Sequence, residues 1–273
     1  MAIRGAMTGG DAEWTPVKLA GTGTAGSVSL VTTSVGPRRE PRELLVALPP
    51  RYAQKSDRYP VLYLHDGQNL FDPETSHAGD WGLAARLNRL ARKGIELIVV
   101  GIPNRGRFRK YDYNPFRDIA HGGGGGDRYL EFVVEQVKPV IEKSFRTKPE
   151  PAHTIIGGSS LGGLISFYAL YRHPDVFGVA SVQSPALWVA NRAIFRFLGQ
   201  QRTPPRGRVY LDIGTAEGSE TLADVRQLRD WLVKGGSREG KELNYVEEAG
   251  GDHTEAAWGT RLEKAMPWLL GKR

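Results

Sequence analysis

A serine flanked by glycines is the feature of this sequence with the clearest chemical potential. Residues 158–162 read Gly-Ser-Ser-Leu-Gly and place Ser160 at the centre of a G-x-S-x-G pattern. An apolar run, residues 154–157, precedes the pattern, and a nearly all-apolar stretch, residues 161–172, follows it. This order predicts a strand, a strained tight turn and a buried helix, which together present a nucleophilic hydroxyl at the carboxyl end of a sheet. The alternative is a glycine-rich turn whose serines cap a helix.

A serine hydroxyl becomes a good nucleophile only when a neighbouring base takes its proton. Of the six histidines, only His173 and His253 follow Ser160 in the chain. His173 ends the predicted helix that starts at the serine, so it lies roughly 20 Å away at 1.5 Å per residue. His253 lies in a loop between the last predicted strand and the last predicted helix. The sequence therefore predicts His253 as the base.

The imidazole in turn needs a carboxylate that fixes its tautomer. In the chain order serine, acid, histidine, this residue lies between Ser160 and His253. Glu217 follows the seventh predicted strand, in a loop at the carboxyl edge of the sheet where Ser160 is expected, and it is our first choice for the acid. Asp212, inside that strand between Leu211 and Ile213, is the second. Glu220 and Asp224 fall at or inside the next predicted helix, and Asp252 is adjacent to His253.

Two backbone N–H groups would complete such a site by stabilising an oxyanion. One belongs to Leu161, directly after the candidate nucleophile. The other is expected from the loop after the third predicted strand, where Gly67 allows a turn that aims the Gln68 N–H at the site. His65 and Asp66 precede this turn, and we expect them to be structural because no metal-ligand spacing accompanies them.

The composition narrows the chemistry further. The chain has 273 residues and no cysteine, which excludes disulfides, thiolate metal sites and a cysteine nucleophile. Its length fits one globular domain, which we expect to span residues 1–273, with edge strands in 1–50 and a catalytic core in 51–273. No apolar run resembles a secretory signal or a membrane span, so we expect a cytoplasmic protein.

The excess positive charge is the unusual bulk property. The sequence holds 37 Lys and Arg against 30 Asp and Glu, a net charge of +7. The charges are scattered, and the densest cluster is Arg105, Arg107, Arg109 and Lys110. Because this cluster alternates with other residue types, we favour a solvated basic loop over a nucleic-acid arm. Binding of a polyanion stays open as an alternative, and it would weaken steeply with salt.

Short apolar runs alternate with amphipathic stretches along most of the chain. Strands are predicted at residues 28–33, 44–48, 61–64, 97–102, 154–157, 179–182, 209–213 and 243–246. Helices are predicted at residues 81–93, 127–144, 161–172, 221–233 and 254–270. From about residue 60 onward this rhythm indicates an α/β fold with a mainly parallel sheet of about eight strands flanked by helices.

Three local expectations can be checked against a structure. The strand signals in the first 50 residues favour antiparallel strands at one edge of the sheet. Five consecutive glycines, residues 122–126, predict a flexible surface loop, with Asp127 as the N-cap of the helix that follows. Pro139 is expected to kink that helix.

Several separated stretches also resemble one family. They are LYLHDGQNLFD, VGIPNRGRFRKYDYNPF, GGSSLGGLISFYALYRHPDVFG, SPALW, DIGTAEG and GGDHTEAAW, and they cover roughly residues 41–271. Together they resemble the putative esterase family of the α/β-hydrolase superfamily, which includes feruloyl esterases, S-formylglutathione hydrolases, enterochelin-type esterases and mycolyltransferases. The resemblance implies an α/β-hydrolase fold without a large cap domain.

The resemblance also implies roles for individual residues. Ser160 would be the nucleophile, Glu217 the acid and His253 the base, with Gln68 and Leu161 donating to the oxyanion. Trp188, in the SPALW stretch, resembles a residue that lines the substrate pocket. We expect Asn69 and Trp81 to bind substrate as well.

The predicted activity is hydrolysis of carboxylic esters, short-chain or aryl, through an acyl-enzyme. Acyl transfer to an alcohol by the same residues is the alternative, and a non-catalytic polyanion-binding module is the third hypothesis. The expected partner is a small ester, with no nucleic acid or membrane. No cofactor and no metal are expected.

Overall fold

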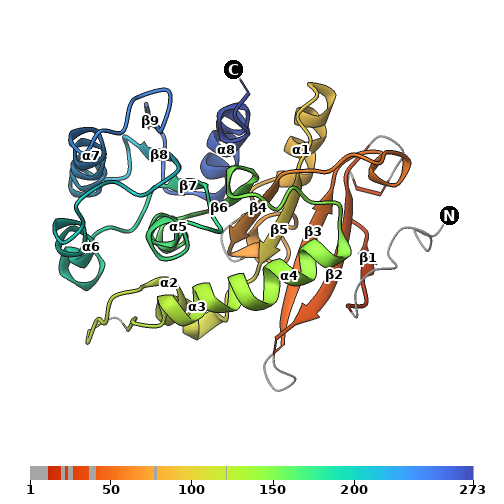
Figure 1. Ribbon diagram of the computed structural model, residues 1–273, viewed down its shortest axis with the longest axis horizontal. Coiled ribbons are helices and arrows are strands. Elements are labelled where there is room, and N and C mark those ends of the chain that lie inside the picture. Colours follow the sequence, from red (N-terminus) through yellow and green to blue (C-terminus); the bar gives the residue numbers. More distant parts are fainter. Residues whose placement is uncertain are drawn as a thin grey trace.

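A nine-stranded sheet lies between helices in the computed structural model, which describes residues 12–19, 22–23, 27–36, 41–76, 79–120 and 122–272 (Figure 1). The strands are β1 (Thr15–Val17), β2 (Ser29–Val35), β3 (Arg42–Leu48), β4 (Val61–His65), β5 (Ile98–Ile102), β6 (Thr154–Ser159), β7 (Val179–Gln183), β8 (Arg208–Gly214) and β9 (Leu243–Glu248). The α-helices are α1 (Leu83–Arg92), α2 (Arg109–Tyr113), α3 (Gly126–Phe132), α4 (Lys138–Ser144), α5 (Leu161–Arg172), α6 (Val189–Gly199), α7 (Ser219–Lys234) and α8 (Glu255–Leu269).

The sheet is antiparallel at one edge and parallel elsewhere. Its strand order is β1-β2-β3-β5-β4-β6-β7-β8-β9. The pairs from β5 to β9 are parallel, whereas β1, β2, β3 and β5 pair antiparallel. The mainly parallel α/β fold and the antiparallel edge are confirmed. The prediction of about eight strands missed β1, because three residues with a central Pro16 carry no strand pattern.

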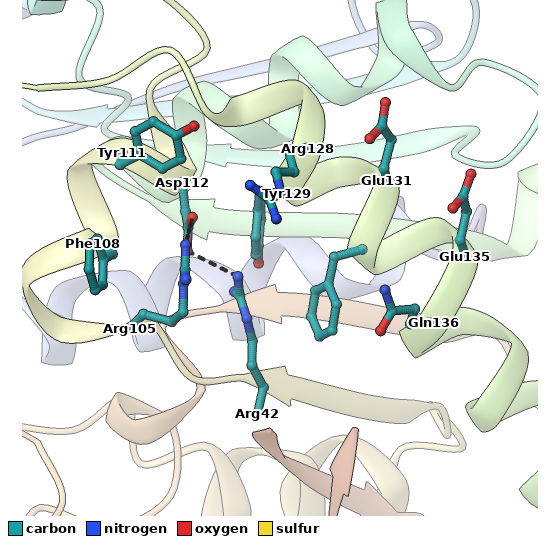
Figure 2. A pocket seen from close by; sticks show the side chains of 11 residues that line it. Arg42, Arg105, Phe108, Tyr111, Asp112, Arg128, Tyr129, Glu131, Glu135 and Gln136 are labelled. Carbon is teal, nitrogen blue, oxygen red and sulfur yellow. Dashed lines mark hydrogen bonds and ion pairs between the residues drawn. The ribbon is translucent and has the colours of Figure 1, made fainter. Parts of the chain in front are cut away.

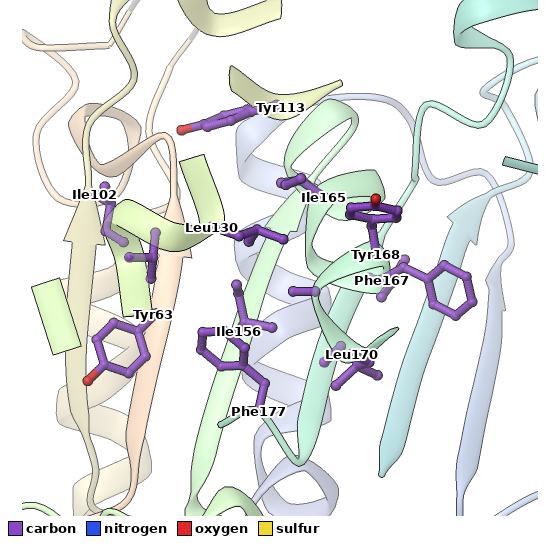
Figure 3. Packing of buried hydrophobic residues seen from close by; sticks show 14 of the residues in the cluster. Tyr63, Ile102, Tyr113, Leu130, Ile156, Ile165, Phe167, Tyr168, Leu170 and Phe177 are labelled. Atoms are coloured by element: carbon purple, nitrogen blue, oxygen red, sulfur yellow. The ribbon is translucent and has the colours of Figure 1, made fainter. Parts of the chain in front are cut away.

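Both faces of the sheet are buried. In β4, Val61 and Tyr63 face one hydrophobic cluster and Leu62 and Leu64 face the other, as the alternation of a strand covered on both sides requires. Helices α1 and α8 cover one face, and the buried residues of α3 to α7 cover the other. Figure 3 shows α5 contributing to that second layer with Ile165 and other large side chains. No helix in the described ranges is long and apolar enough to cross a membrane.

The helix predicted for residues 127–144 is interrupted. It consists of α3, a π-helical turn (Val133–Val137) and α4, with Pro139 in the first turn of α4. The wider turn accommodates a ring that would clash with a regular helix, so the proline alters the helix without ending it. The N-cap prediction is wrong: α3 begins at Gly126, and Asp127 pairs with Arg172 at 2.7 Å instead.

The glycine run is packed against the chain that precedes it. A Cβ on Gly125 would lie 2.2 Å from the Tyr111 ring, and one on Gly123 would lie 2.4 Å from the Phe116 carbonyl oxygen. Gly123, Gly125 and Gly126 therefore allow close approach, which differs from the loose surface loop expected from composition, whereas Gly122 has open space around it. The loop expected around Arg105 also differs, because a 3₁₀ turn and α2 form there.

A similarly close approach makes a helical glycine essential in α8. Alanine usually favours a helix over glycine by about 1 kcal/mol, yet a Cβ on Gly259 would lie 2.2 Å from the Trp81 carbonyl oxygen. We expect Gly259→Ala to lower the free energy of unfolding by about 2 kcal/mol through overpacking. Urea unfolding measures this. Gly199, at the end of α6, has open space around it, so Gly199→Ala is the control and should be neutral or stabilising.

Candidate active site

Ser160 lies at a strained turn between β6 and α5. Its backbone has φ 55° and ψ −120°, a conformation that non-glycine residues rarely adopt. The turn is held by hydrogen bonds on both sides: the Ser160 N–H donates to the Gln183 carbonyl at 3.0 Å, and the Ser160 carbonyl accepts from the Ala186 N–H at 3.0 Å. A Cβ on Gly163 would lie 2.9 Å from the Gln183 oxygen, so only glycine fits there without a shift. The predicted strand, strained turn and helix are all present.

The structure joins the predicted acid and base. His253 Nδ1 lies 2.6 Å from Glu217 Oε2; the Glu217 side chain is 1% exposed and that of His253 44% exposed. An ionised carboxylate can only accept, so Nδ1 carries the hydrogen and Nε2 is left for proton transfer. Among the hydrogen bonds of the described residues, none joins the Ser160 hydroxyl to His253.

Buried donors hold the Glu217 carboxylate. Its Oε1 accepts from the Ser184 hydroxyl at 2.7 Å, the Gly214 N–H at 2.8 Å and Arg261 Nη2 at 3.2 Å. Burial by itself raises the pKa of Glu217, but the hydrogen bonds from His253, Ser184 and Gly214 outweigh it, and the pKa lies below its ordinary value. Glu217 is therefore ionised at neutral pH and can stabilise an imidazolium.

Asp212, the second choice for the acid, contacts Gln183, Ser184 and Arg261. It is fully buried and accepts from the Ser184 N–H and Gln183 Nε2, each at 3.2 Å, while Arg261 Nε lies 3.3 Å away. Burial raises the pKa of Asp212 to about 6, against the opposing effect of Arg261. Of the two candidates, only Glu217 bonds His253.

Sequence reasoning missed three residues behind the acid. The Ser184 hydroxyl donates to Glu217 and accepts from Trp258 Nε1 at 3.0 Å and Arg261 Nη2 at 2.7 Å. Ser184 has φ 41° and is fully buried, and Arg261 is 1% exposed. The Trp258 ring meets that of His253 edge to face at 4.7 Å. The sequence did contain a signal for Arg261. It lies three residues after Trp258, so a charged residue falls on the otherwise apolar stripe of the last helix.

The predicted oxyanion residues lie at two adjoining turns. Gln68 is in a 3₁₀ turn (Gly67–Asn69) directly after β4, and Leu161 begins α5. Neither backbone N–H donates to another group of the described residues, so both remain available to a ligand. A Cβ on Gly67 would lie 2.6 Å from the Ile102 nitrogen, which explains the glycine before Gln68.

An ion pair that the sequence did not reveal fixes the first of these turns. Asp66 has φ 55°, and its two carboxylate oxygens accept from Arg109 Nε and Nη2, each at 2.8 Å. Asn104 also donates to Asp66, at 2.6 Å through Nδ2, and its backbone N–H donates to Gln68 Oε1 at 3.1 Å. These bonds hold the residues on either side of Gly67.

His65 is a structural residue, as expected. It is 1% exposed, its Nδ1 lies 2.8 Å from the Tyr129 hydroxyl, and burial lowers its pKa to about 3. His65 is therefore neutral at physiological pH. Within the part of the chain that the structure describes, no group of three His, Asp or Glu side chains could hold a metal ion.

The three predicted substrate residues lie in different surroundings. Trp188 follows β7 with 51% of its surface exposed. Asn69 is half-buried and donates to Glu255 at 3.3 Å, at the start of α8. Trp81 is 2% exposed and packs against Trp258 with ring centroids 6.2 Å apart. The Trp81 prediction does not fit this placement, because its ring supports Trp258 from inside the core instead of lining an open pocket.

The basic cluster is partly neutralised by the fold. Arg109 pairs with Asp66, and Arg105 Nη2 lies 2.7 Å from Asp112 Oδ1. The guanidinium of Arg107 lies over the Phe108 ring at 4.8 Å. Two of its four cations thus bind carboxylates that are nearly buried, and the cluster is more than a solvated surface loop.

The Ser184 hydroxyl predicts a measurable loss of stability. Ser184→Ala would leave Trp258 Nε1 without its partner and take one bond from both Glu217 and Arg261, so we expect the free energy of unfolding to fall by about 1–3 kcal/mol. Ser181→Ala is a matched control, because the Ser181 hydroxyl is equally buried and has no hydrogen-bond partner in the described structure. Chemical denaturation of both variants gives the comparison. Equal losses would contradict the role assigned to Ser184.

Solved structures share the fold. A Bacillus cereus protein titled BES superposes with a TM-score of 0.70 at 21% identity, over 93% of this chain and 98% of its own. The siderophore hydrolase EstA from Aspergillus nidulans superposes with a TM-score of 0.68 at 22% identity, over 89% of this chain and 94% of its own. At these identities the likeness shows the fold alone.

The chain is also similar in sequence to other proteins. The Bacillus subtilis protein YbbA, itself uncharacterised, is 29% identical over 85% of this chain and 93% of its own. The siderophore triacetylfusarinine C esterase of Aspergillus fumigatus is 31% identical, but the alignment spans only 55% of this chain and 53% of that enzyme. The family model described as Putative esterase matches residues 18–269. The chain therefore belongs to the putative esterase family.

Proposed function

We propose that this protein is a serine carboxylesterase with Ser160, Glu217 and His253 as its catalytic triad. The observation that carries the proposal is the 2.6 Å bond between Glu217 and His253, formed across the carboxyl edge of the sheet on which Ser160 occupies a strained turn. Membership of an esterase family supports the same reaction class.

The proposed reaction begins with proton transfer. His253 Nε2 takes the proton of Ser160, whose oxygen attacks the ester carbonyl, while Glu217 stabilises the imidazolium that results. The bond from Ser160 to His253 is expected to form with substrate bound, since catalytic hydrogen bonds are often long in free enzymes. The N–H groups of Gln68 and Leu161 would stabilise the oxyanion of the tetrahedral intermediate.

The intermediate then collapses in two stages. His253 donates its proton to the departing alcohol, and an acyl group remains on the Ser160 oxygen. Water attacks this acyl-enzyme with His253 again as base, which releases the acid and restores the hydroxyl. The exposed His253 side chain gives water direct access to this step.

The surroundings of the triad favour an open site for short-chain or aryl esters. Trp188 presents an exposed aromatic surface next to the segment that holds Ser160. Relatives named as siderophore esterases extend the candidates to siderophore esters.

Replacing the nucleophile should abolish turnover without unfolding the protein. We expect Ser160→Ala to lower kcat for p-nitrophenyl acetate by about 10⁴-fold or more, with the melting temperature nearly unchanged. Ser159→Ala is the matched control: Ser159 is the neighbouring serine, and its variant should keep activity within a few fold. Near-normal hydrolysis by Ser160→Ala would disprove the triad.

A second pair of variants separates the two candidate acids. Glu217→Gln should lower kcat by about 10²–10⁴-fold, because the amide cannot stabilise the imidazolium. Asp212→Asn should keep kcat within about tenfold but lower the free energy of unfolding by about 3 kcal/mol, because it breaks a buried pair with Arg261. Steady-state kinetics and urea unfolding of both variants test this assignment. A larger loss of kcat in Asp212→Asn would reverse it.

A further inference from the structure

A cavity of about 620 Å³ lies beside α2 (Figure 2). Its walls come from α2 and the turn before it, from α3 and the π-helical turn, and from Arg42 at the start of β3. None of Ser160, Glu217 and His253 lines it. Its volume suits a small organic ligand.

Three arginines line this cavity, Arg42, Arg105 and Arg128. Arg42 and Arg105 share a single carboxylate, that of Asp112, at 3.1 Å and 2.7 Å. Arg42 Nη1 is buried and has no hydrogen-bond partner in the described structure. Arg128, which lines the same cavity, forms no ion pair with another described side chain. The unpartnered Arg42 Nη1 and the Arg128 guanidinium, which lines the same cavity, favour an anion beside them.

Aromatic rings form much of the remaining wall. Phe108 and Tyr111 are 39% and 41% exposed, which is unusual for large apolar side chains in this protein. The Phe132 ring lies under the Arg42 guanidinium at 4.5 Å. The exposed parts of Phe108 and Tyr111 offer apolar contact to a planar ring.

The opposite end of the cavity limits the charge of the ligand. Figure 2 shows the carboxylates of Glu131 and Glu135 on the far side from Arg42 and Arg105. A second anionic group there would be repelled, so the lining selects a ligand with one negative end and an uncharged ring. We propose that this cavity binds an aromatic monocarboxylate, with its carboxylate beside Arg42, Arg105 and Arg128.

Helix α2 connects this cavity to the candidate active site. Asp112 holds two of the three arginines of the cavity, and Arg109, three residues earlier, holds Asp66 beside the candidate oxyanion turn. A ligand of this chemistry could be the acidic end of a long ester whose carbonyl lies at Ser160, or a separate small molecule. Both sources share the carboxylate and the ring, and kinetics distinguish them.

Calorimetric titration of the full chain with naphthalene-2-carboxylate tests the site. We expect the acid to bind at least about tenfold more tightly than naphthalene-2-carboxamide, which keeps the ring but lacks the charge. Arg128→Gln should weaken binding of the acid by about tenfold, whereas Arg226→Gln, the same change at an exposed arginine paired with Glu247, should not. Equal affinity for acid and amide, or equal behaviour of the two variants, would overturn the proposal.

Hydrolysis of p-nitrophenyl acetate in the presence of the same acid identifies the source. A rise in KM alone means that the cavity is continuous with the ester site, and a change in kcat alone means a separate ligand acting through α2. Either effect must disappear in Arg128→Gln; an effect that persists there would place the ligand at Ser160 and overturn the proposal. The titration needs no turnover, so it remains decisive even if the proposed esterase activity fails.

Discussion

A buried guanidinium shared by two carboxylates is the interaction on which the candidate site depends. Arg261 lies between Asp212 and Glu217, and all three side chains are at most 1% exposed. Two buried anions without this cation would repel each other and shift toward their neutral forms. Arg261 contacts both carboxylates, and the hydrogen bonds from His253, Ser184 and Gly214 keep Glu217 ionised toward His253. Removing one partner of such a group typically costs about 3–5 kcal/mol, so the proposed triad and the fold share one electrostatic anchor.

Ser184 links the Arg261 ion pairs to the other residues of the candidate site. Its hydroxyl bonds Glu217, Trp258 and Arg261, while its backbone N–H bonds Asp212. It therefore joins the turn after β7 to the loop after β8 and to α8. The turn at Gln68, the candidate oxyanion site, has an equivalent anchor in Asp66 and Arg109. Both anchors hold non-glycine residues at positive φ, Ser184 and Asp66, and each backbone is kept in place by several side chains from elsewhere.

Much of the fold could be read from local patterns. The predicted helix at residues 161–172 coincides with α5, and both ends of each predicted strand fall within two residues of the ends of β2 to β9. These segments are strongly apolar, so their pattern reports burial directly. The failures have a common cause. Tertiary contacts between segments determine the packing of the glycine run, the formation of α2 and the N-terminal boundary of α3. Local residue propensities do not encode those contacts.

For the site, sequence alone nominated Ser160, His253 and Glu217, because chemistry restricts which residue types can act and chain order restricts where they can lie. It left Asp212 open as the acid and could not see Ser184, Arg261 or the Asp66–Arg109 pair. Those depend on contacts between residues 28 to 77 positions apart, or on a side chain aimed by a turn. Sequence thus determined the reactive groups and the elements that carry them. Only the tertiary structure decided which carboxylate meets the imidazole, because that depends on distances of a few ångströms between segments that no local pattern relates.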